Sequence, residues 1–215
     1  MYVPDAFRLD DSARMAAVMR AFDFALLVTA PDGAVQASHL PFLYDPDAGE
    51  NGMLHAHMAR ANPQWRDFET LAEAGQEALV IFQGPHAYIS PTWYGGDTPQ
   101  VPTWNYVAVH AYGLPRIVEG AAEKRALLDR LVATHEAALA APWSTAGLTE
   151  AYMEGMLRGL VAFEIPVTRL EAKAKLSQNK PTAQLAAATA VLEQAVDPTA
   201  RATGEWMRQA LEAKG

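Results

Sequence analysis

The chain has 215 residues and half of them are apolar, so it is long enough to bury a sizeable core and should be globular. It carries 17 Lys and Arg against 25 Asp and Glu, and the net charge of -8 excludes a global basic field for non-specific nucleic-acid binding. It has no cysteine, which excludes disulfides, thiolate metal sites and a cysteine nucleophile. The opening residues resemble no signal peptide, and no apolar run approaches the roughly 18 residues of a membrane span, so we expect a soluble cytoplasmic protein.

The first part of the chain is predicted to begin with a helix and a hairpin. Residues 10–23 have a helical pattern, with Asp10 or Asp11 as the cap. FALLVTA and AVQASHLPFLY then flank the turn PDG, in which Pro31 presets one dihedral angle and Gly33 permits a positive one. This pattern is typical of two antiparallel strands.

The next segment is predicted to pair a short strand with a helix. MLHAHM reads as the strand, and RANPQWRDFETLAEAG follows it as the helix. Asn62 is a plausible cap, Pro63 suits the first turn, and Gly75 ends the helix.

The rest of the chain is predicted to be strand-rich in the middle and helical at its end. EALVIFQG, AYIS and the run from Thr103 to Val118 predict strands, and a Gly- and Pro-rich loop, YGGDTPQVP, separates the last two. Helices are expected over 121–140 and 149–157, followed by a strand that ends in the basic segment EAKAKLSQNK. The tail 181–214 predicts two helices broken at DPT. One mostly antiparallel sheet with helices at its ends, or a closed barrel, fits this order best.

The segment VPTWNYVAVHAYG, residues 101–113, has aromatic and polar side chains along one strand. A period of two puts one set of side chains on one face and a second set on the other: Trp104, Tyr106, His110 and Tyr112 against Thr103, Asn105, Val107 and Val109. The aromatic residues are either core residues with a polar tip at the rim or a wall for a flat ligand or a partner chain.

The motif HAH places His55 and His57 on the same face of a strand, where both can reach one metal ion. Two ligands do not make a metal site, and a third ligand is not identified by the sequence. The alternative is a pair of histidines that form hydrogen bonds within a polar pocket.

The motif HMARANPQW joins the end of a strand to the start of a helix. Unpaired N–H groups at a helix N-terminus and the guanidinium of Arg60 are together suited to an anion. The alternative is a helix capped by Asn62 with a solvated arginine. The later segment EAKAKLSQNK is either a solvated charged surface or, because amides alternate with its lysines, a contact for phosphate or the edge of a heterocycle.

Several of these segments together resemble a known family. MYVPDAFR, HLPFLYDP, LHAHMARANPQW, PHAYISPTWY, VPTWNYVAVHAYG and KLSQNK are similar, in this order, to the PaiB-type FMN-binding proteins, which are often called negative transcriptional regulators. The resemblance implies an α+β fold that is mainly antiparallel, an FMN-binding split β-barrel with peripheral helices, and a homodimer with FMN at the subunit interface. It places the barrel domain at residues 1–180 and a C-terminal helical extension, packed on the same domain, at 181–215.

The resemblance also implies which residues bind FMN. It places Ser38, His39 and Leu40 at the flavin edge, and His57, Arg60 and Asn62 at the phosphate and ribityl chain. Ser90, Trp93 and Tyr94 are then near the ring system, Trp104 and Asn105 come from the other subunit, and Lys175, Gln178 and Asn179 cover the site. The related oxidases usually have an Arg-Lys pair where this chain has RANPQ.

Two functions follow from the resemblance, and no residue names a substrate or a catalytic group. The first is a flavin-dependent regulator or sensor, and the second is an FMN-dependent oxidoreductase of the reductase or oxidase kind. A metal or haem protein built on HAH is a weaker third. With a net charge of -8 and no helix-turn-helix pattern, direct DNA binding would have to rest on residues 169–180 or on the C-terminal helices.

Overall fold

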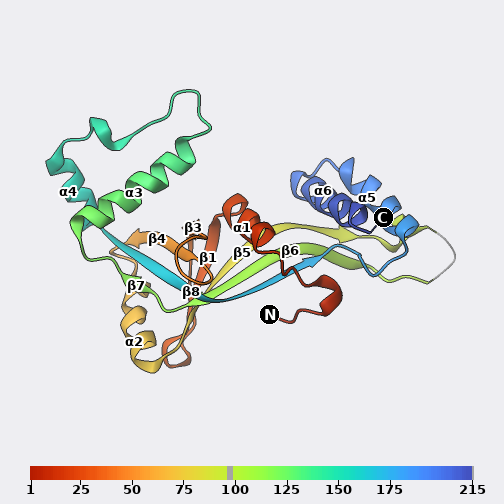
Figure 1. The fold of residues 1–215 in the computed structure, drawn as a ribbon, viewed down its shortest axis with the longest axis horizontal. Coiled ribbons are helices and arrows are strands. Elements are labelled where there is room, and N and C mark those ends of the chain that lie inside the picture. Colours follow the sequence, from red (N-terminus) through yellow and green to blue (C-terminus); the bar gives the residue numbers. More distant parts are fainter. Residues whose placement is uncertain (96–98, 215) are drawn as a thin grey trace. The chain divides into compact units, whose positions relative to one another are not determined.

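The computed structural model describes residues 1–95 and 99–214, and its strands form one antiparallel sheet (Figure 1). The strand order is β2-β1-β5-β6-β8-β4-β3, and β7 pairs with β8. This confirms the expected α+β class with a curled, mainly antiparallel sheet. The strands are β1 (Phe24–Thr29), β2 (Gln36–Pro41), β3 (Leu43–Asp45), β4 (Met53–Ala59), β5 (Ala78–Ile89), β6 (Thr103–Gly113), β7 (Arg116–Ile117) and β8 (Leu160–Lys175).

Helices occupy most of the segments that the sequence predicts as helical. They are α1 (Ser12–Ala21), α2 (Asp67–Ala74), α3 (Ala121–Glu136), α4 (Glu150–Arg158), α5 (Thr182–Glu193) and α6 (Pro198–Glu212). In the described part of the chain, no helix is long and apolar enough to cross a membrane.

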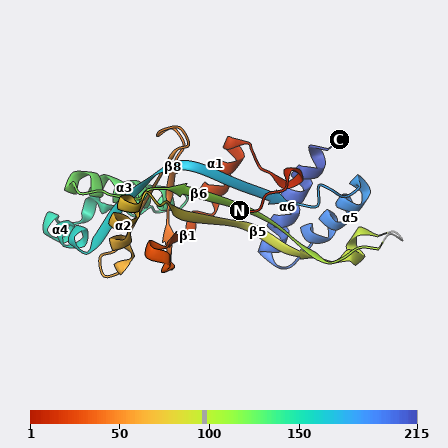
Figure 2. The same cartoon turned by 90° about the horizontal axis from the view of Figure 1, so that it is seen from below.

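The chain divides into two compact units, and three long strands contribute to both. Unit 1 contains Met1–Phe22, Phe82–His110 and Glu171–Gly215, and unit 2 contains Asp23–Ile81 and Ala111–Leu170. Figure 2 shows the three strands β5, β6 and β8 running next to one another. The C-terminal helices therefore cluster with the first residues of the chain and the middle of the sheet, and the predicted domain boundary at residue 180 stays a prediction.

Unit 2 contains the predicted hairpin and the aromatic part of the core. β1 and β2 pair in the register Phe24↔Pro41 to Thr29↔Gln36, around a turn in which Gly33 has a φ of 82°. Contacts between β2 and β4 curl the sheet. The rings of Phe42, Phe68 and Phe163 pack together inside it, and the centroids of the last two are 5.0 Å apart.

A second, smaller cluster lies where α3 covers the other face of β4 and β8. It contains Leu43, Leu127, Leu131, Leu160 and Ala162. Because residues alternate along β4, Leu54, Ala56 and Met58 are buried, whereas His55 and His57 alternate with them on the other face of the strand.

Unit 1 contains α1 and the helix pair α5 and α6, which pack side by side (Figure 1). Asp11 caps α1 by accepting the N–H of Arg14 at 3.0 Å, as predicted. The break at DPT is also confirmed, because Pro198 occupies the first turn of α6 and Asp197 caps it. A Cβ at Gly204 would lie 2.9 Å from the backbone nitrogen of Glu193, so only glycine allows the two helices to approach this closely.

Four predicted boundaries were wrong. EALVIFQG and AYIS are one strand, β5, because Gly84 lets the backbone of Val107 approach its Cα and the strand continues through Pro85. The predicted strand from Thr103 to Val118 is divided at Leu114 and Pro115 into β6 and β7. The helix after Asn62 begins with a tight 3-10 segment, η3 (Pro63–Arg66), before α2, and α3 ends before residue 140. Residues 96–98 of the predicted loop YGGDTPQVP lie outside the described residues.

Candidate functional site

The predicted FMN-binding residues form two sets, one in each unit. Neither set is contiguous in sequence, and the fold brings the members of each set onto neighbouring elements. Unit 2 holds Ser38, His39, Leu40, His57, Arg60 and Asn62, and unit 1 holds Ser90, Trp93, Tyr94, Trp104, Asn105, Lys175, Gln178 and Asn179.

In unit 2, Asn62 connects the start of η3 to the edge strand β2. Its side-chain oxygen accepts the N–H of Gln64 at 3.0 Å, which confirms the predicted cap. Its amide nitrogen donates to the hydroxyl of Ser38 at 2.8 Å. Both polar ends of Asn62 thus have partners within the protein. On the same strand, Leu40 is buried and His39 is exposed, with its ring stacked on that of Phe24.

A buried network beside Asn62 was missed by the sequence analysis. The carboxylate of Asp67 accepts the hydroxyl of Thr29 at 2.6 Å and the amide of Gln36 at 3.0 Å. Gln64 is 1% exposed, and its amide donates to the Leu27 carbonyl and to the Thr29 hydroxyl. We call Arg60, Asn62, Gln64 and Asp67 the polar corner. Gln64 and Asp67 belong to the helical pattern that follows Pro63. Polar residues at helix positions that face a sheet are the sequence signal that could have identified this network.

Arg60 of the polar corner is held by backbone carbonyls. Its Nε donates to the carbonyl of Arg158 at 2.9 Å and its Nη2 to that of Leu160 at 3.1 Å. The guanidinium also lies 5.8 Å from the ring centroid of Trp65. Arg60 therefore fixes the turn between α4 and β8, and a phosphate would have to use the donors that remain.

His55 and His57 project from the face of β4 opposite the one that carries Leu54, Ala56 and Met58. His55 Nε2 and His57 Nδ1 are buried and have no hydrogen-bond partner among the described residues. Burial lowers the pKa of His57, and burial and the nearby Arg130 lower that of His55. Both imidazoles are thus kept neutral at neutral pH. In the described residues, no group of three or more His, Asp or Glu side chains is arranged to hold a metal ion.

In unit 1, four aromatic side chains from β5, β6 and the segment after β5 form one wall of a groove. His86 and Tyr88 project from β5 and Trp104 from β6, and Trp93 follows β5 in the 3-10 turn η4 (Pro91–Tyr94). The ring of Tyr88 makes edge contacts with both tryptophans, at centroid distances of 6.5 and 6.1 Å. Trp104 remains 54% exposed. The predicted alternation along β6 is confirmed, because Asn105, Val107 and Val109 are buried on the opposite face.

The opposite wall of this groove comes from the C-terminal helices. Its residues are at the end of α5, the start of α6 and the connection between them: Val191, Leu192, Ala195, Asp197, Thr199 and Ala200. The cavity has a volume of about 450 Å³. Asp197 is the single charged residue among the described residues that line it, and no Lys or Arg does. We call this cavity the aromatic groove.

A buried hydroxyl supports the aromatic wall from behind. Ser177 Oγ is 2.8 Å from the hydroxyl of Tyr94 and accepts the Asn105 amide at 2.9 Å. Asn105 is 0% exposed and Ser177 3%. Ser177 also has a φ of 65°, which is uncommon for a residue other than glycine. Since Tyr94 and Asn105 directly adjoin Trp93 and Trp104 in the chain, Ser177 holds the backbone that carries both tryptophans.

The remaining predicted residues of unit 1 mostly bind their own neighbourhood. Lys175 donates to the hydroxyl of Thr103 at 2.5 Å, and Gln178 bonds to the backbone of Ala174 and Leu176. The hydroxyl of Ser90 caps η4. Asn179 is exposed. The KLSQNK segment is therefore a structural turn in this unit, apart from Asn179.

The sequence analysis missed two parts of the aromatic groove. His86 and Tyr88 lie two residues apart on a strand, like Trp104 and Tyr106, and the same period of two would have found them. The wall formed by the C-terminal helices carried no such signal, because its residues are small, aliphatic or common cap residues.

Comparisons with known proteins identify relatives of the chain and solved structures with a similar fold. Residues 1–169 match the family model described as "Putative FMN-binding domain". The chain is 34% identical to the protease synthase and sporulation protein PAI 2 of Bacillus subtilis over 99% of both chains. It is 32% identical to an uncharacterized protein of Emericella nidulans, over 67% of this chain and 69% of that protein.

Two solved structures resemble the fold. One is an FAD- and haem-binding protein from Mycobacterium smegmatis, with a TM-score of 0.55, 16% identity and coverage of 78% of this chain and 73% of that one. The other is a flavocytochrome from Azotobacter vinelandii, with a TM-score of 0.53, 13% identity and coverage of 76% and 67%.

Proposed function

The chain belongs to the PaiB-type family of FMN-binding proteins, whose cofactor is FMN, and we propose that the aromatic groove of unit 1 receives the isoalloxazine ring. We further propose that the protein acts as a flavin-dependent regulator or sensor. The observation that carries the proposal is the groove itself, with exposed aromatic side chains on one wall and aliphatic ones on the other.

The groove suits a flat ring in size and chemistry. Ligand cavities are commonly about 300–1,000 Å³ and are lined mainly by apolar and aromatic side chains with few polar groups. The aromatic groove, at about 450 Å³, has this composition. An isoalloxazine ring placed there gains offset or edge contacts with Trp93, Tyr88 and Trp104. Tyr88 and Trp104 are 45% and 54% exposed and are therefore accessible to it.

The phosphate of FMN is assigned separately. A dianion is not expected among the lining residues of the aromatic groove, since their one charge is the carboxylate of Asp197. We propose that FMN lies at the interface of a homodimer, where Arg60 of the partner subunit anchors the phosphate, because the Nη1 group of Arg60 has no hydrogen-bond partner among the described residues. Its two hydrogen bonds to carbonyls hold the guanidinium in place, so it need not move when phosphate binds.

A regulatory role is supported by the chemistry that the groove contains. Bound FMN supplies electron and hydride transfer by itself, so the residues around it decide whether a second reactant is used. The titratable lining residues are His86, Tyr88 and Asp197, and none of them identifies a substrate. The Bacillus subtilis relative is named for protease synthesis and sporulation, which are cellular processes and not reactions.

An oxidoreductase is the second candidate, and the exposure of Trp104 favours it. A groove whose ring wall remains open on one side leaves room for a second reactant. Adding NADH or NADPH to the FMN-loaded protein separates the two functions. With free FMN added as the electron acceptor, an oxidoreductase of this kind oxidises the nicotinamide in many turnovers, whereas a sensor oxidises no more than the one equivalent that reduces its own flavin.

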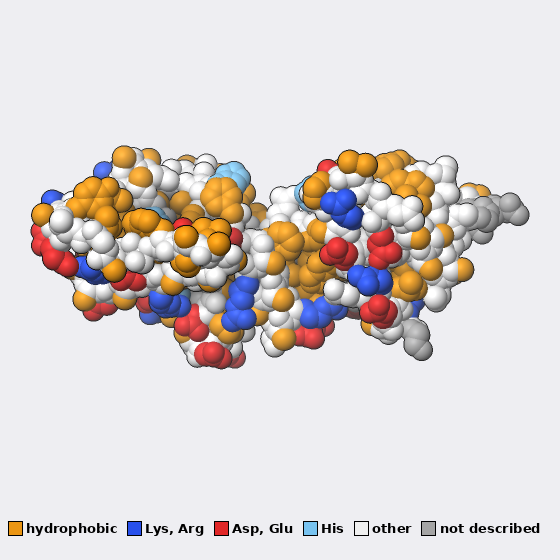
Figure 3. All heavy atoms as spheres, turned by 90° about the horizontal axis from the view of Figure 1, so that it is seen from above, with side chains coloured by type: hydrophobic (Ala, Val, Ile, Leu, Met, Phe, Trp, Pro, Cys, Tyr) orange, Lys and Arg blue, Asp and Glu red, His pale blue; other side chains and the backbone are white. Residues whose placement is uncertain are grey.

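We propose a homodimer and no direct, sequence-selective contact with DNA. Exposed aromatic residues with a polar surround are typical of subunit interfaces, and Tyr88 and Trp104 are exposed in the single chain. On the face shown in Figure 3, the described Lys and Arg side chains alternate with acidic ones and form no continuous basic patch. Sedimentation at micromolar concentration that detects only the 23.3 kDa monomer would contradict the dimer.

The proposed function is tested by titrating FMN into the protein and into two tryptophan variants. Trp104→Leu should weaken FMN about tenfold, because a stacked aromatic face is lost. The matched control is Trp143→Leu in unit 2, since Trp143 is 52% exposed and lies outside the aromatic groove. Fluorescence quenching of FMN measures both affinities. Equal affinity of the wild type and Trp104→Leu would contradict the placement of the ring.

A further inference from the structure

We propose that Asp197 selects the orientation of the flavin by accepting a hydrogen bond from the N3–H group of the isoalloxazine ring. The inference rests on the proposed function and extends it to the C-terminal helices, which lie beyond the residues matched by the family model. It assigns a binding role to the connection between α5 and α6.

The two walls of the aromatic groove offer a ligand different contacts. One wall is formed by rings that can stack on either face of a flavin and do not distinguish its two ends. The other wall is aliphatic apart from Asp197, Thr199 and the backbone. Among the described lining residues, the carboxylate of Asp197 is thus the strongest hydrogen-bond acceptor that a ligand can meet.

The side chain of Asp197 is exposed, and a hydrogen bond to the start of α6 holds it in place. Its Oδ1 accepts the backbone N–H of Ala200 at 2.8 Å, which fixes the side chain at the N-terminus of the 15-residue helix α6. The next residue, Pro198, has no N–H and therefore does not compete for the carboxylate. Oδ2 has no hydrogen bond to the described residues, so one oxygen remains for a ligand.

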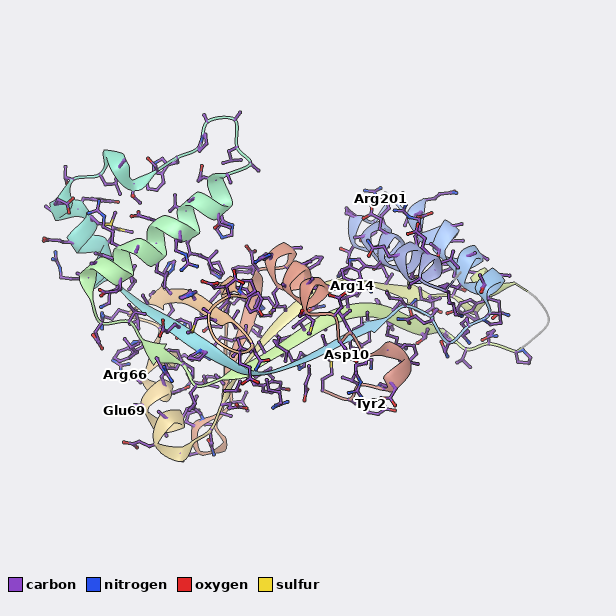
Figure 4. All side chains as sticks on the ribbon, in the orientation of Figure 1. Tyr2, Asp10, Arg14, Arg66, Glu69 and Arg201 are labelled. Carbon is purple, nitrogen blue, oxygen red and sulfur yellow. The ribbon has the colours of Figure 1, made fainter. Side chains whose placement is uncertain are left out.

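The first charged residue of α6, Arg201, forms no ion pair with this carboxylate in the described part of the chain. Arg201 lies on α6 (Figure 4), and its guanidinium donates to the backbone carbonyl of Ala195 at 3.1 Å. Ala195 lines the aromatic groove, so this bond also ties the start of α6 to the connection that precedes it. Two hydrogen bonds within the helix pair, from the Ala200 N–H to Asp197 and from Arg201 to the Ala195 carbonyl, therefore hold this wall of the groove in place.

The two ends of the isoalloxazine ring differ in their hydrogen-bonding groups. Oxidised isoalloxazine has one ring N–H group, N3–H, at its pyrimidine end, and its other end carries only methyl groups. A carboxylate facing the methyl groups loses hydration without gaining a hydrogen bond, whereas facing N3–H it gains a charge-assisted one. The pyrimidine end should therefore lie against the start of α6. The same charge keeps the phosphate of FMN away from this wall.

The experiment uses two flavins that differ only at N3 and that lack a ribityl phosphate. Lumiflavin retains N3–H, and 3-methyllumiflavin does not. Binding of each to the full-length protein is measured by fluorescence quenching, which requires no enzymatic activity. The wild type should bind lumiflavin about tenfold more tightly than 3-methyllumiflavin, as expected for one charge-assisted hydrogen bond to an exposed carboxylate that the bound ring covers.

The key variant is Asp197→Ser, because serine is also a preferred helix cap and leaves α6 intact while removing the carboxylate. In this variant the two flavins should bind equally. Asp197→Asn retains both the cap and a neutral acceptor, and the preference should fall to roughly threefold. The matched control is Asp11→Ser. Asp11 caps α1 in the same unit by accepting the N–H of the residue three positions later, as Asp197 does for α6, and this variant should retain the tenfold preference.

Each outcome decides between the inference and the proposed function. Equal binding of the two flavins by the wild type, or an unchanged preference in Asp197→Ser, would overturn the role of Asp197. If Trp104→Leu weakens both flavins while Asp197→Ser changes neither, the ring occupies the aromatic groove in another orientation. If lumiflavin does not bind the wild type, or binds Trp104→Leu equally well, the groove itself is the wrong site and the inference fails with it.

Discussion

The polar corner of unit 2 and the aromatic groove of unit 1 both contain residues that the sequence marks as functional, yet the protein uses them differently. In the polar corner, Asn62, Gln64 and Asp67 bond to the β1–β2 hairpin. In the aromatic groove, Trp104 and Tyr88 remain exposed. Polar residues near a helix start thus connect elements of the protein to one another, while the exposed rings are available to a ligand or a second subunit.

The largest expected effect is on the stability of the polar corner. Asp67→Ala removes the acceptor of Thr29 and Gln36 in a buried place and should lower the free energy of unfolding by about 3 kcal/mol. Urea unfolding measures this loss. The exposed Asp47→Ala is the control and should change stability by less than about 0.5 kcal/mol. The folded variant should bind lumiflavin with wild-type affinity, and a weakened affinity would contradict the different uses of the two regions.

The next effect concerns the hydroxyl that supports the aromatic wall. Ser177→Ala leaves the buried Asn105 amide and the Tyr94 hydroxyl without their shared partner, so stability should fall by about 2 kcal/mol. Unlike the change at Asp67, this one should also weaken lumiflavin, because Trp93 and Trp104 lose their fixed backbone. The near-UV circular dichroism of the tryptophans reports that change. Unaltered lumiflavin binding would show that the support acts on stability alone.

A smaller effect is expected at Arg60, where the two roles of the polar corner meet. Arg60→Ala should reduce the ratio of FMN to riboflavin affinity about tenfold if the guanidinium binds phosphate. It should also lower stability by about 1 kcal/mol, because the carbonyls of Arg158 and Leu160 lose their donors.

The control for Arg60 is Arg66→Ala. Arg66, which is labelled in Figure 4, lies 4.8 Å from the centroid of the same Trp65 ring, and its guanidinium donates no hydrogen bond to a carbonyl among the described residues. It should retain both the affinity ratio and the stability. If Arg60→Ala keeps the wild-type ratio while it loses stability, Arg60 belongs entirely to the protein's own structure, and the polar corner binds no phosphate.

The smallest effect is a change in the pH dependence of stability. Burial lowers the pKa of His57 below its usual value near 6.5, so the unfolded chain takes up a proton first as the pH falls. Stability is therefore fully present above that pH and decreases as the pH falls through it. His57→Leu should make the decrease shallower, as measured by urea unfolding between about pH 7 and 5. The exposed His39→Leu is the control, and an identical slope in His57→Leu would contradict the assignment.

Local patterns predicted most elements, because the forces behind them act within a few residues. The caps at Asp11 and Asn62, the turn at Gly33 and the break at Asp197 depend on nearby N–H groups and dihedral angles. The alternation along β6 follows from the geometry of a single strand. The continuity of β5 was not predicted, because Gly84 reads as a turn residue until Val107 is known to lie against it.

The sequence by itself determined the antiparallel α+β class, the family and the two faces of the strand at residues 103–113. Only the tertiary structure decided what the candidate side chains do. Asn62 bonds to a residue 24 positions away, and Arg60 to carbonyls 98 and 100 positions away. The aromatic wall is likewise completed by helices that begin after residue 181. A hydrogen bond or a groove wall depends on distances in space, and these are set by how distant segments pack, which no local pattern of residues contains.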